Sequence, residues 1–175
     1  MFKHPTQHDS PRARGFTLVE VLVSLVILSI GLLGVAKLML FSSHANDSAY
    51  LRSQATALAY EILDNMRANK TEAIAHTYDT TFAAGPVAPG NLCEGLNVCT
   101  TSPQLALYDV YRWKQRLNAT AGTGALPNGQ GFVQTVLTAP QTAVTIKVQW
   151  DDSAAQSVFP LSGAAQQVVV LETLL

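Results

Sequence analysis

The feature that most constrains this chain is an apolar run from Phe16 to Phe41 with only two charged residues, Glu20 and Lys37. A helix needs roughly 20 apolar residues to cross a bilayer, and this run reaches that length. A secretory signal peptide would have a shorter apolar core, followed by a cleavage site with small residues. No such site follows the run, so it predicts a membrane-spanning helix that stays attached to the chain.

The residues before the run set its orientation. Residues 1–15 carry a single acid, Asp9, and three basic residues, Lys3, Arg12 and Arg14. Basic residues beside a membrane span remain on the cytoplasmic side. We therefore expect a single-pass inner-membrane protein whose residues 1–15 are cytoplasmic and whose C-terminal part is periplasmic.

The stretch from Gly15 to Ser24 reads Gly-Phe-Thr-Leu-Val-Glu-Val-Leu-Val-Ser. It resembles the prepilin signature of type IV pilins and of type II secretion pseudopilins. The resemblance implies that a prepilin peptidase cleaves between Gly15 and Phe16, and that the new first residue, Phe16, is N-methylated. Residues 1–15 would then be a leader peptide that the mature subunit lacks.

Glu20 places a carboxylate inside the apolar run. A charge in hydrocarbon costs on the order of 3 kcal/mol and usually has a function. Cleavage after Gly15 would leave the amine of Phe16 about one helical turn away. The resemblance implies that Glu20 pairs with the first residue of a neighbouring subunit during assembly. The alternative is a structural carboxylate near a helix N-terminus, where the helix dipole favours it.

Past Phe41 the chain becomes amphipathic, and apolar residues recur at helical spacing. The pattern predicts one continuous helix from Phe16 to about Asn69. Its transmembrane half, residues 16–41, would face lipid or the core of a filament, and its amphipathic half, residues 42–70, would pack on a domain. The residues expected on the packed face are Leu51, Ala55, Leu58, Ile62 and Met66.

Residues 71–175 are expected to form one periplasmic globular domain. Residues 71–103 show no sustained period and contain turn pairs of Gly and Pro, so they predict a long connecting loop. Ser102-Pro103 is a helix-start signal, and a short helix is expected from Gln104 to Asn118. Its packed side would carry Leu107, Val110, Tyr111 and Leu117.

Three strands are expected in the second half of the domain. Residues 143–151 alternate apolar and polar side chains, with Val144, Ile146, Val148 and Trp150 on one face. Residues 132–138 and 168–175 are the other two strands, and the apolar run of the last one suggests burial on both faces or an interior position. The fold class is therefore α+β. The resemblance implies a type IV pilin-like fold, in which the long helix packs on a small antiparallel sheet.

Two cysteines, Cys93 and Cys99, lie on the side of the membrane where disulfides persist. We predict a disulfide between them. A metal site would need two further ligands, and neither His44 nor His76 is at ligand spacing. The chain also lacks a nucleophile motif and a phosphate-binding loop, so we expect no enzyme activity, no metal and no cofactor.

Charge gives little support for a nucleic-acid partner. Without residues 1–15, eight basic residues remain against eleven acidic ones. Arg112, Lys114 and Arg116 form a short basic cluster, which we interpret as the solvated face of a helix. Three charges are too few to indicate DNA binding.

The second half of the domain resembles a subgroup of pilins, the PilV group of minor pilins. The resemblance rests on Trp113 followed by Leu117, on Leu126-Pro127-Asn128-Gly129, and on the alternating strand that ends at Asp151. It implies a structural subunit that helps to initiate type IV pilus assembly and enters the pilus in low amounts near the tip, with roles in twitching motility and adhesion. Its partners would be other minor pilins, the major pilin, the prepilin peptidase, the inner-membrane assembly platform and a tip adhesin. The alternative is a minor pseudopilin of type II secretion.

Overall fold

The structure, a computed structural model, describes residues 15–90, 92–95, 98–118, 125–138, 140–153 and 166–175. The leader predicted at residues 1–15 therefore lies outside the described residues except for Gly15. The chain divides into two compact units, Met1–Leu40 and Phe41–Leu175. The described elements are the helices α1 (Leu18–Ala68), α2 (Lys70–Ile74) and α3 (Ser102–Leu117), and the strands β1 (Gln130–Thr138), β2 (Gln141–Asp151) and β3 (Gln166–Leu174).

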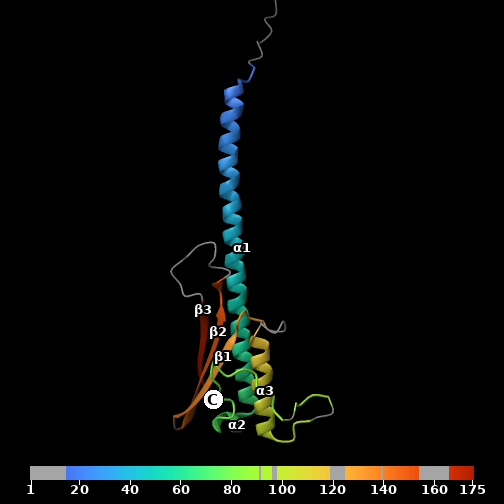
Figure 1. Ribbon diagram of the computed structural model, residues 1–175. Coiled ribbons are helices and arrows are strands. Elements are labelled where there is room, and N and C mark those ends of the chain that lie inside the picture. The colour runs from blue at the N-terminus through green and yellow to red at the C-terminus, as the bar shows by residue number, and fades with distance from the viewer. Residues whose placement is uncertain (1–14, 91, 96–97, 119–124, 139, 154–165) are drawn as a thin grey trace, which may run out of the picture. The chain divides into compact units, whose positions relative to one another are not determined.

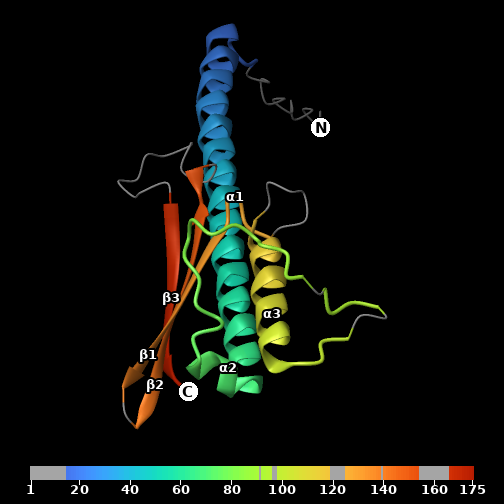
Figure 2. The same ribbon diagram turned by 60° about the horizontal axis from the view of Figure 1, so that its bottom comes forward.

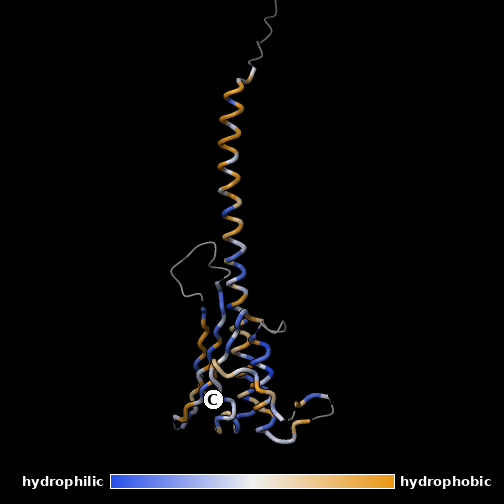
Figure 3. Tube along the Cα trace, in the orientation of Figure 1, coloured by the Kyte–Doolittle hydropathy of each residue, from blue (hydrophilic) through white to orange (hydrophobic). Residues whose placement is uncertain are grey.

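The described part of the first unit is the N-terminal part of α1. Figure 3 shows that this part of the helix is predominantly hydrophobic, whereas the later turns of α1 mix polar and apolar residues. The helix continues through Gly31 and Gly34, where a side chain would meet nothing within 4 Å. The prediction of one helix from Phe16 to about Asn69 agrees with α1 within two residues at its start and one at its end.

The second unit is built on the C-terminal part of α1. In Figures 1 and 2, α3 runs beside this part of α1 and the three strands lie together next to the helices. Of the residues predicted for the packed face of α1, Ala55, Leu58, Ile62 and Met66 are buried, and Leu51 packs against the core. The apolar spacing in this half of the helix therefore predicted the contact face correctly.

The sheet has the strand order β1-β2-β3, and both pairs are antiparallel. The predicted inner face of β2 is buried, because Val144, Ile146, Val148 and Trp150 are each at most 1% exposed. They pack with α1 and α3 in one hydrophobic core. The molecule thus has the α+β, pilin-like arrangement of a long N-terminal helix packed on a small antiparallel sheet.

The expected interior position of the last strand is wrong. β3 is an edge strand, since it pairs only with β2 among the described strands. Val169 and Leu171 pack partly against the core, whereas Val168 and Val170 on the other face are about half exposed. The apolar run suggested burial on both faces, but the third strand of this sheet has a helix layer on one face only.

The expected loop at residues 71–103 is wrong for its first ten residues. They contain α2 from its second residue on, a fully buried Tyr78, and a β-bridge between Thr80 and Val133 of β1. These residues include too few apolar side chains to show a period. Their contacts with β1 and α3 hold them in a regular structure.

The packed side of α3 also differs from the prediction. The stripe that packs on the rest of the unit is Ala106, Val110, Trp113, Lys114 and Leu117, of which Val110 and Leu117 were predicted. Tyr108 is buried outside this stripe, while Leu107 is 49% exposed. The spacing of this stripe is helical, but it includes a lysine, which hydrophobicity alone assigns to solvent. The helix starts two residues before the expected Gln104, with Thr101 as the N-cap and Ser102-Pro103 as its first two residues.

Candidate functional site: the N-terminal turn of the long helix

The first turn of α1 is capped by Thr17. The backbone N–H of Glu20 donates to Oγ1 of Thr17 at 3.3 Å and to the carbonyl of Thr17 at 3.1 Å. Thr17 and Glu20 therefore have the spacing of a capping box, in which the acid follows the capping residue by three positions. This places the Glu20 carboxylate in the first turn, where the helix dipole favours a negative charge.

Glu20 lies on one side of the helix in an open groove, together with Phe16, Val21, Ser24, Leu25 and Leu28. The hydroxyl of Ser24 donates to the backbone carbonyl of Glu20 at 2.7 Å, so this hydroxyl is engaged within the helix. In the part of the chain that the structure describes, the Glu20 carboxylate forms no ion pair. The carboxylate is thus placed by its own helix and available to a cation outside it.

The surface of α1 around Glu20 is hydrophobic. Every large apolar side chain from Phe16 to Leu40 is at least 49% exposed in the isolated chain. Among the described residues, α1 is the one helix long and apolar enough to cross a membrane. Exposed apolar surface on this scale requires a cover of lipid or of other apolar helices.

Residues 10–36 match the family model described as the prokaryotic N-terminal methylation motif. The chain is type IV prepilin-like. No curated protein and no solved structure matches it. The motif belongs to structural subunits and implies processing by a prepilin peptidase and assembly with other pilins. A membrane-anchored pilin or pseudopilin subunit fits this motif together with the apolar helix.

The prepilin-like chain has no basic patch on α3, because its three basic residues are engaged in different contacts. Arg112 lies over the Tyr108 ring, 5.7 Å from its centroid. Arg116 forms an ion pair with Glu61 of α1 at 2.5 Å. Lys114 is buried, so the predicted solvated face is wrong for this residue. Arg116 thus reaches α1, Lys114 reaches β1 and the segment after α2, and Arg112 remains on α3.

Lys114 joins α3 to the segment after α2 and to β1 through hydrogen bonds. Its ammonium donates to the carbonyls of Thr81 at 2.6 Å, Ala84 at 2.8 Å and Gly131 at 2.7 Å. Three N–H groups thus meet three acceptors. Burial lowers the pKa of Lys114 from 10.5 to about 8. A sequence signal for this residue is its place in the same helical stripe as Trp113.

A second buried polar contact joins the segment after α2 to α3. The Tyr78 hydroxyl donates to Oδ2 of Asp109 at 2.9 Å. Burial raises the pKa of the Tyr78 hydroxyl and also that of the Asp109 carboxyl. Both residues are remote in sequence and neither stands in a motif, so sequence reasoning did not find them.

Cys93 and Cys99 are joined by a disulfide. The loop that they close is tied to α3, because the Tyr108 hydroxyl donates to Glu94 at 2.7 Å. The described residues contain no group of three or more His, Cys, Asp or Glu side chains that could hold a metal ion. His76 instead lies 3.0 Å from the carboxylate of Asp79.

Lys114→Met is expected to lower the free energy of unfolding by about 2 kcal/mol or more. Each carbonyl left without a donor costs about 1–3 kcal/mol. For three carbonyls the cost is about 3–9 kcal/mol, and the middle of this range exceeds the roughly 3 kcal/mol that burying the charge costs, judged from the lowered pKa. Denaturant unfolding of the full chain in detergent measures the difference. Equal or higher stability of the variant would show that desolvation of the ammonium outweighs its hydrogen bonds.

The pH profile is an internal check on Lys114. The native chain should release this proton near pH 8, whereas the unfolded chain holds it to about pH 10.5. The unfolded state binds more protons in that window, so stability should rise with pH across it. Lys114→Met should lack this rise.

Proposed function

We propose that the chain is a minor pilin that helps to initiate type IV pilus assembly and enters the pilus in low amounts, near the tip. The observation that carries the proposal is the exposed apolar start of α1, with Glu20 in its first turn and a match to the methylation motif. The resemblance of the second unit to PilV-group pilins supports the minor role. Twitching motility and adhesion are the processes it would serve.

The mechanism starts with cleavage between Gly15 and Phe16 and methylation of the Phe16 amine. The subunit is stored in the inner membrane, with α1 in lipid, until the assembly platform extracts it. Apolar helices of neighbouring subunits then replace the lipid contacts. In this environment the Glu20 carboxylate pairs with the amine of a neighbour's first residue, which offsets the cost of burying the charge and sets the register.

The second unit supplies the contacts that distinguish one subunit from another. Its partners in this proposal are other minor pilins, the major pilin and a tip adhesin. The loop closed by Cys93 and Cys99 is held on α3 through Glu94 and Tyr108. The described residues of this segment, Glu94 among them, would offer a surface to such a partner.

Deleting the gene tests the proposal. We expect surface pili to be lost and partly restored when the retraction motor is also absent, because a priming subunit speeds initiation without being required for elongation. Type II secretion should continue in the same strain. Intact pili with failed secretion would overturn the proposal and identify a type II secretion pseudopilin.

A further inference from the structure

The two edges of the sheet differ in how their backbone groups are satisfied. At the β1 edge, Thr80 and Val133 exchange two backbone hydrogen bonds of 2.9 and 3.0 Å. The N–H of Thr135 donates to Asp79 at 2.9 Å, and the carbonyl of Gly131 accepts from Lys114. Four of the six outward backbone groups of Gly131, Val133 and Thr135 are therefore paired.

The β1 contacts fix which groups of β3 point away from the sheet. Alternate residues of an antiparallel strand direct both backbone groups to the same neighbour. Since Gly131, Val133 and Thr135 point outward from β1, the register makes Val169, Leu171 and Thr173 the residues that bond to β2. The backbone groups of Val168, Val170, Glu172 and Leu174 then face the open edge of β3.

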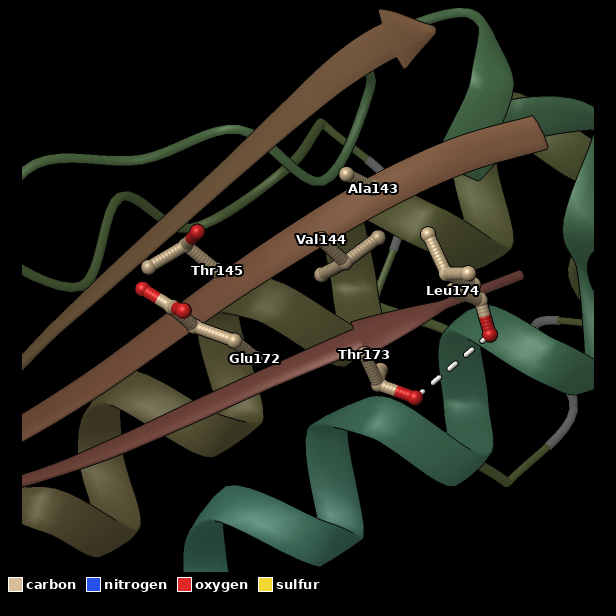
Figure 4. Close-up of a pocket in the computed structure, with 6 residues that line it drawn as sticks. All are labelled: Ala143, Val144, Thr145, Glu172, Thr173 and Leu174. Atoms are coloured by element: carbon tan, nitrogen blue, oxygen red, sulfur yellow. Dashed lines mark hydrogen bonds between the residues drawn. The ribbon is translucent and has the colours of Figure 1, made fainter.

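The same four residues direct their side chains to the solvent face of the sheet. Val168, Val170 and Leu174 are 47%, 49% and 54% exposed. Figure 4 shows Glu172 and Leu174 beside Ala143 and Thr145 of β2, where they line an open hollow of about 390 Å³. The nine residues of β3 pair with β2 in one continuous register and contain no proline or lysine. Natural edge strands are usually protected by such residues or by bulges.

Glu172 indicates the chemistry of the partner. It is the one charged residue of β3 and forms no ion pair with the described residues. The lysine on the neighbouring row, Lys147, lies over the Phe132 ring instead, 5.3 Å from its centroid. If the β3 strands of two copies of this chain paired, neither strand would place a cation opposite Glu172, because β3 contains no Lys or Arg. Self-pairing therefore leaves Glu172 without a counterion.

We propose that the open edge of β3 binds an extended strand of a different pilus subunit, one that carries alternating apolar residues and a Lys or Arg opposite Glu172. The added strand would take the outward N–H and carbonyl groups of Val168, Val170 and Glu172 and the outward N–H of Leu174, whose carbonyl accepts from Oγ1 of Thr173 at 3.5 Å. Its apolar side chains would extend the surface formed by the two valines, and one would enter the hollow beside Ala143. This inference rests on the proposed function, because the partner is another subunit of the pilus.

The test uses the full chain in cells that make pili. A photoreactive p-benzoylphenylalanine is placed at the edge by Val168→p-benzoylphenylalanine, and cross-linked products from sheared pili are identified by mass spectrometry. Gln134→p-benzoylphenylalanine is the matched control, because Gln134 lies on the same face in β1, at the covered edge. We expect position 168, and not position 134, to capture a strand of another subunit with a basic residue near the adduct.

Two further substitutions separate the backbone contribution from the charge. Val170→Pro removes an N–H that faces the open edge, and proline is tolerated at such edge positions. Glu172→Lys reverses the charge, and Gln134→Lys adds the same charge at the covered edge. Val170→Pro and Glu172→Lys should each lower the cross-linking yield at position 168 by about tenfold. Gln134→Lys should leave that yield unchanged. Equal protease resistance in the membrane fraction shows that each variant is folded.

Capture of a second copy of this chain at position 168, equal yields from positions 134 and 168, or no effect of either edge variant would overturn the inference. The inference would also be overturned if the chain is present in sheared pili but forms no adduct at position 168. In that case the proposed function would still stand. Absence of the unsubstituted chain from sheared pili would overturn the proposed function itself.

Discussion

Gly15→Leu is expected to leave the chain uncleaved in the inner membrane. A side chain at Gly15 would meet nothing within 4 Å in the folded chain, so the fold does not require glycine there. If the proposed peptidase cleaves after Gly15, a bulky residue at this position should lower the cleavage rate by roughly 100-fold or more. Mass spectrometry of the membrane fraction distinguishes the full-length chain from one that begins at methylated Phe16.

Gly31→Leu is the matched control, because Gly31 is equally free of neighbours but lies within the helix. That variant should be cleaved normally. Efficient maturation of Gly15→Leu would contradict the proposed cleavage site. Since cleavage should precede extraction, the uncleaved variant should also be absent from sheared pili.

Glu20 can be tested separately from processing. Glu20→Gln keeps a side chain compatible with the capping box but removes the charge, whereas Glu20→Ala removes both. If pairing with the Phe16 amine drives assembly, both variants should be inserted and cleaved, and both should be depleted from sheared pili. Normal incorporation of Glu20→Gln would leave Glu20 with the structural role of a helix-terminal side chain.

Trp113→Ala is expected to destabilise the second unit by about 3–5 kcal/mol, the usual cost of removing a buried aromatic side chain. Trp113 is fully buried, and its indole N–H donates to the carbonyl of Leu58 at 2.8 Å, which joins α3 to α1. For a unit of this size the loss should lower Tm by roughly 10–20 °C. Thermal unfolding of the full chain in detergent measures it, with Trp113→Phe as the milder control.

Gly131 offers an independent check on this packing. A Cβ at Gly131 would overlap the Trp113 ring and the side chain of Leu117. Gly131→Ala should therefore cost about 1–3 kcal/mol in the native chain. The cost should be much smaller in the Trp113→Ala background, because the cavity accepts the methyl group. Additive effects of the two substitutions would show that the ring and Gly131 are not coupled.

Several elements were predictable from local patterns. The start of α1 follows from an apolar run of membrane length, and the buried face of its later turns follows from the spacing of residues such as Ala55 and Ile62. The alternation in β2 placed Val144 through Trp150 on the buried face of a sheet. In each case the pattern is long enough to fix both the type of element and its buried side.

The predictions failed where burial depends on what a segment meets. In α3, Lys114 is buried because three carbonyls from two distant segments surround its ammonium. Leu107, an apolar residue at helical spacing, is nevertheless 49% exposed. The apolar composition of β3 indicated an interior strand, but strand order depends on pairing across the whole sheet.

By itself the sequence determined the prepilin-like N-terminus, the long helix and the presence of an antiparallel sheet, because these depend on composition, short motifs and periodicity within one segment. Only the tertiary structure decided that the buried Lys114 bonds to distant segments and that Trp113 packs against Gly131. It also decided that Val168, Val170, Glu172 and Leu174 of β3 lie at an open edge of the described sheet. Those properties depend on contacts between segments far apart in the chain, which no local pattern records.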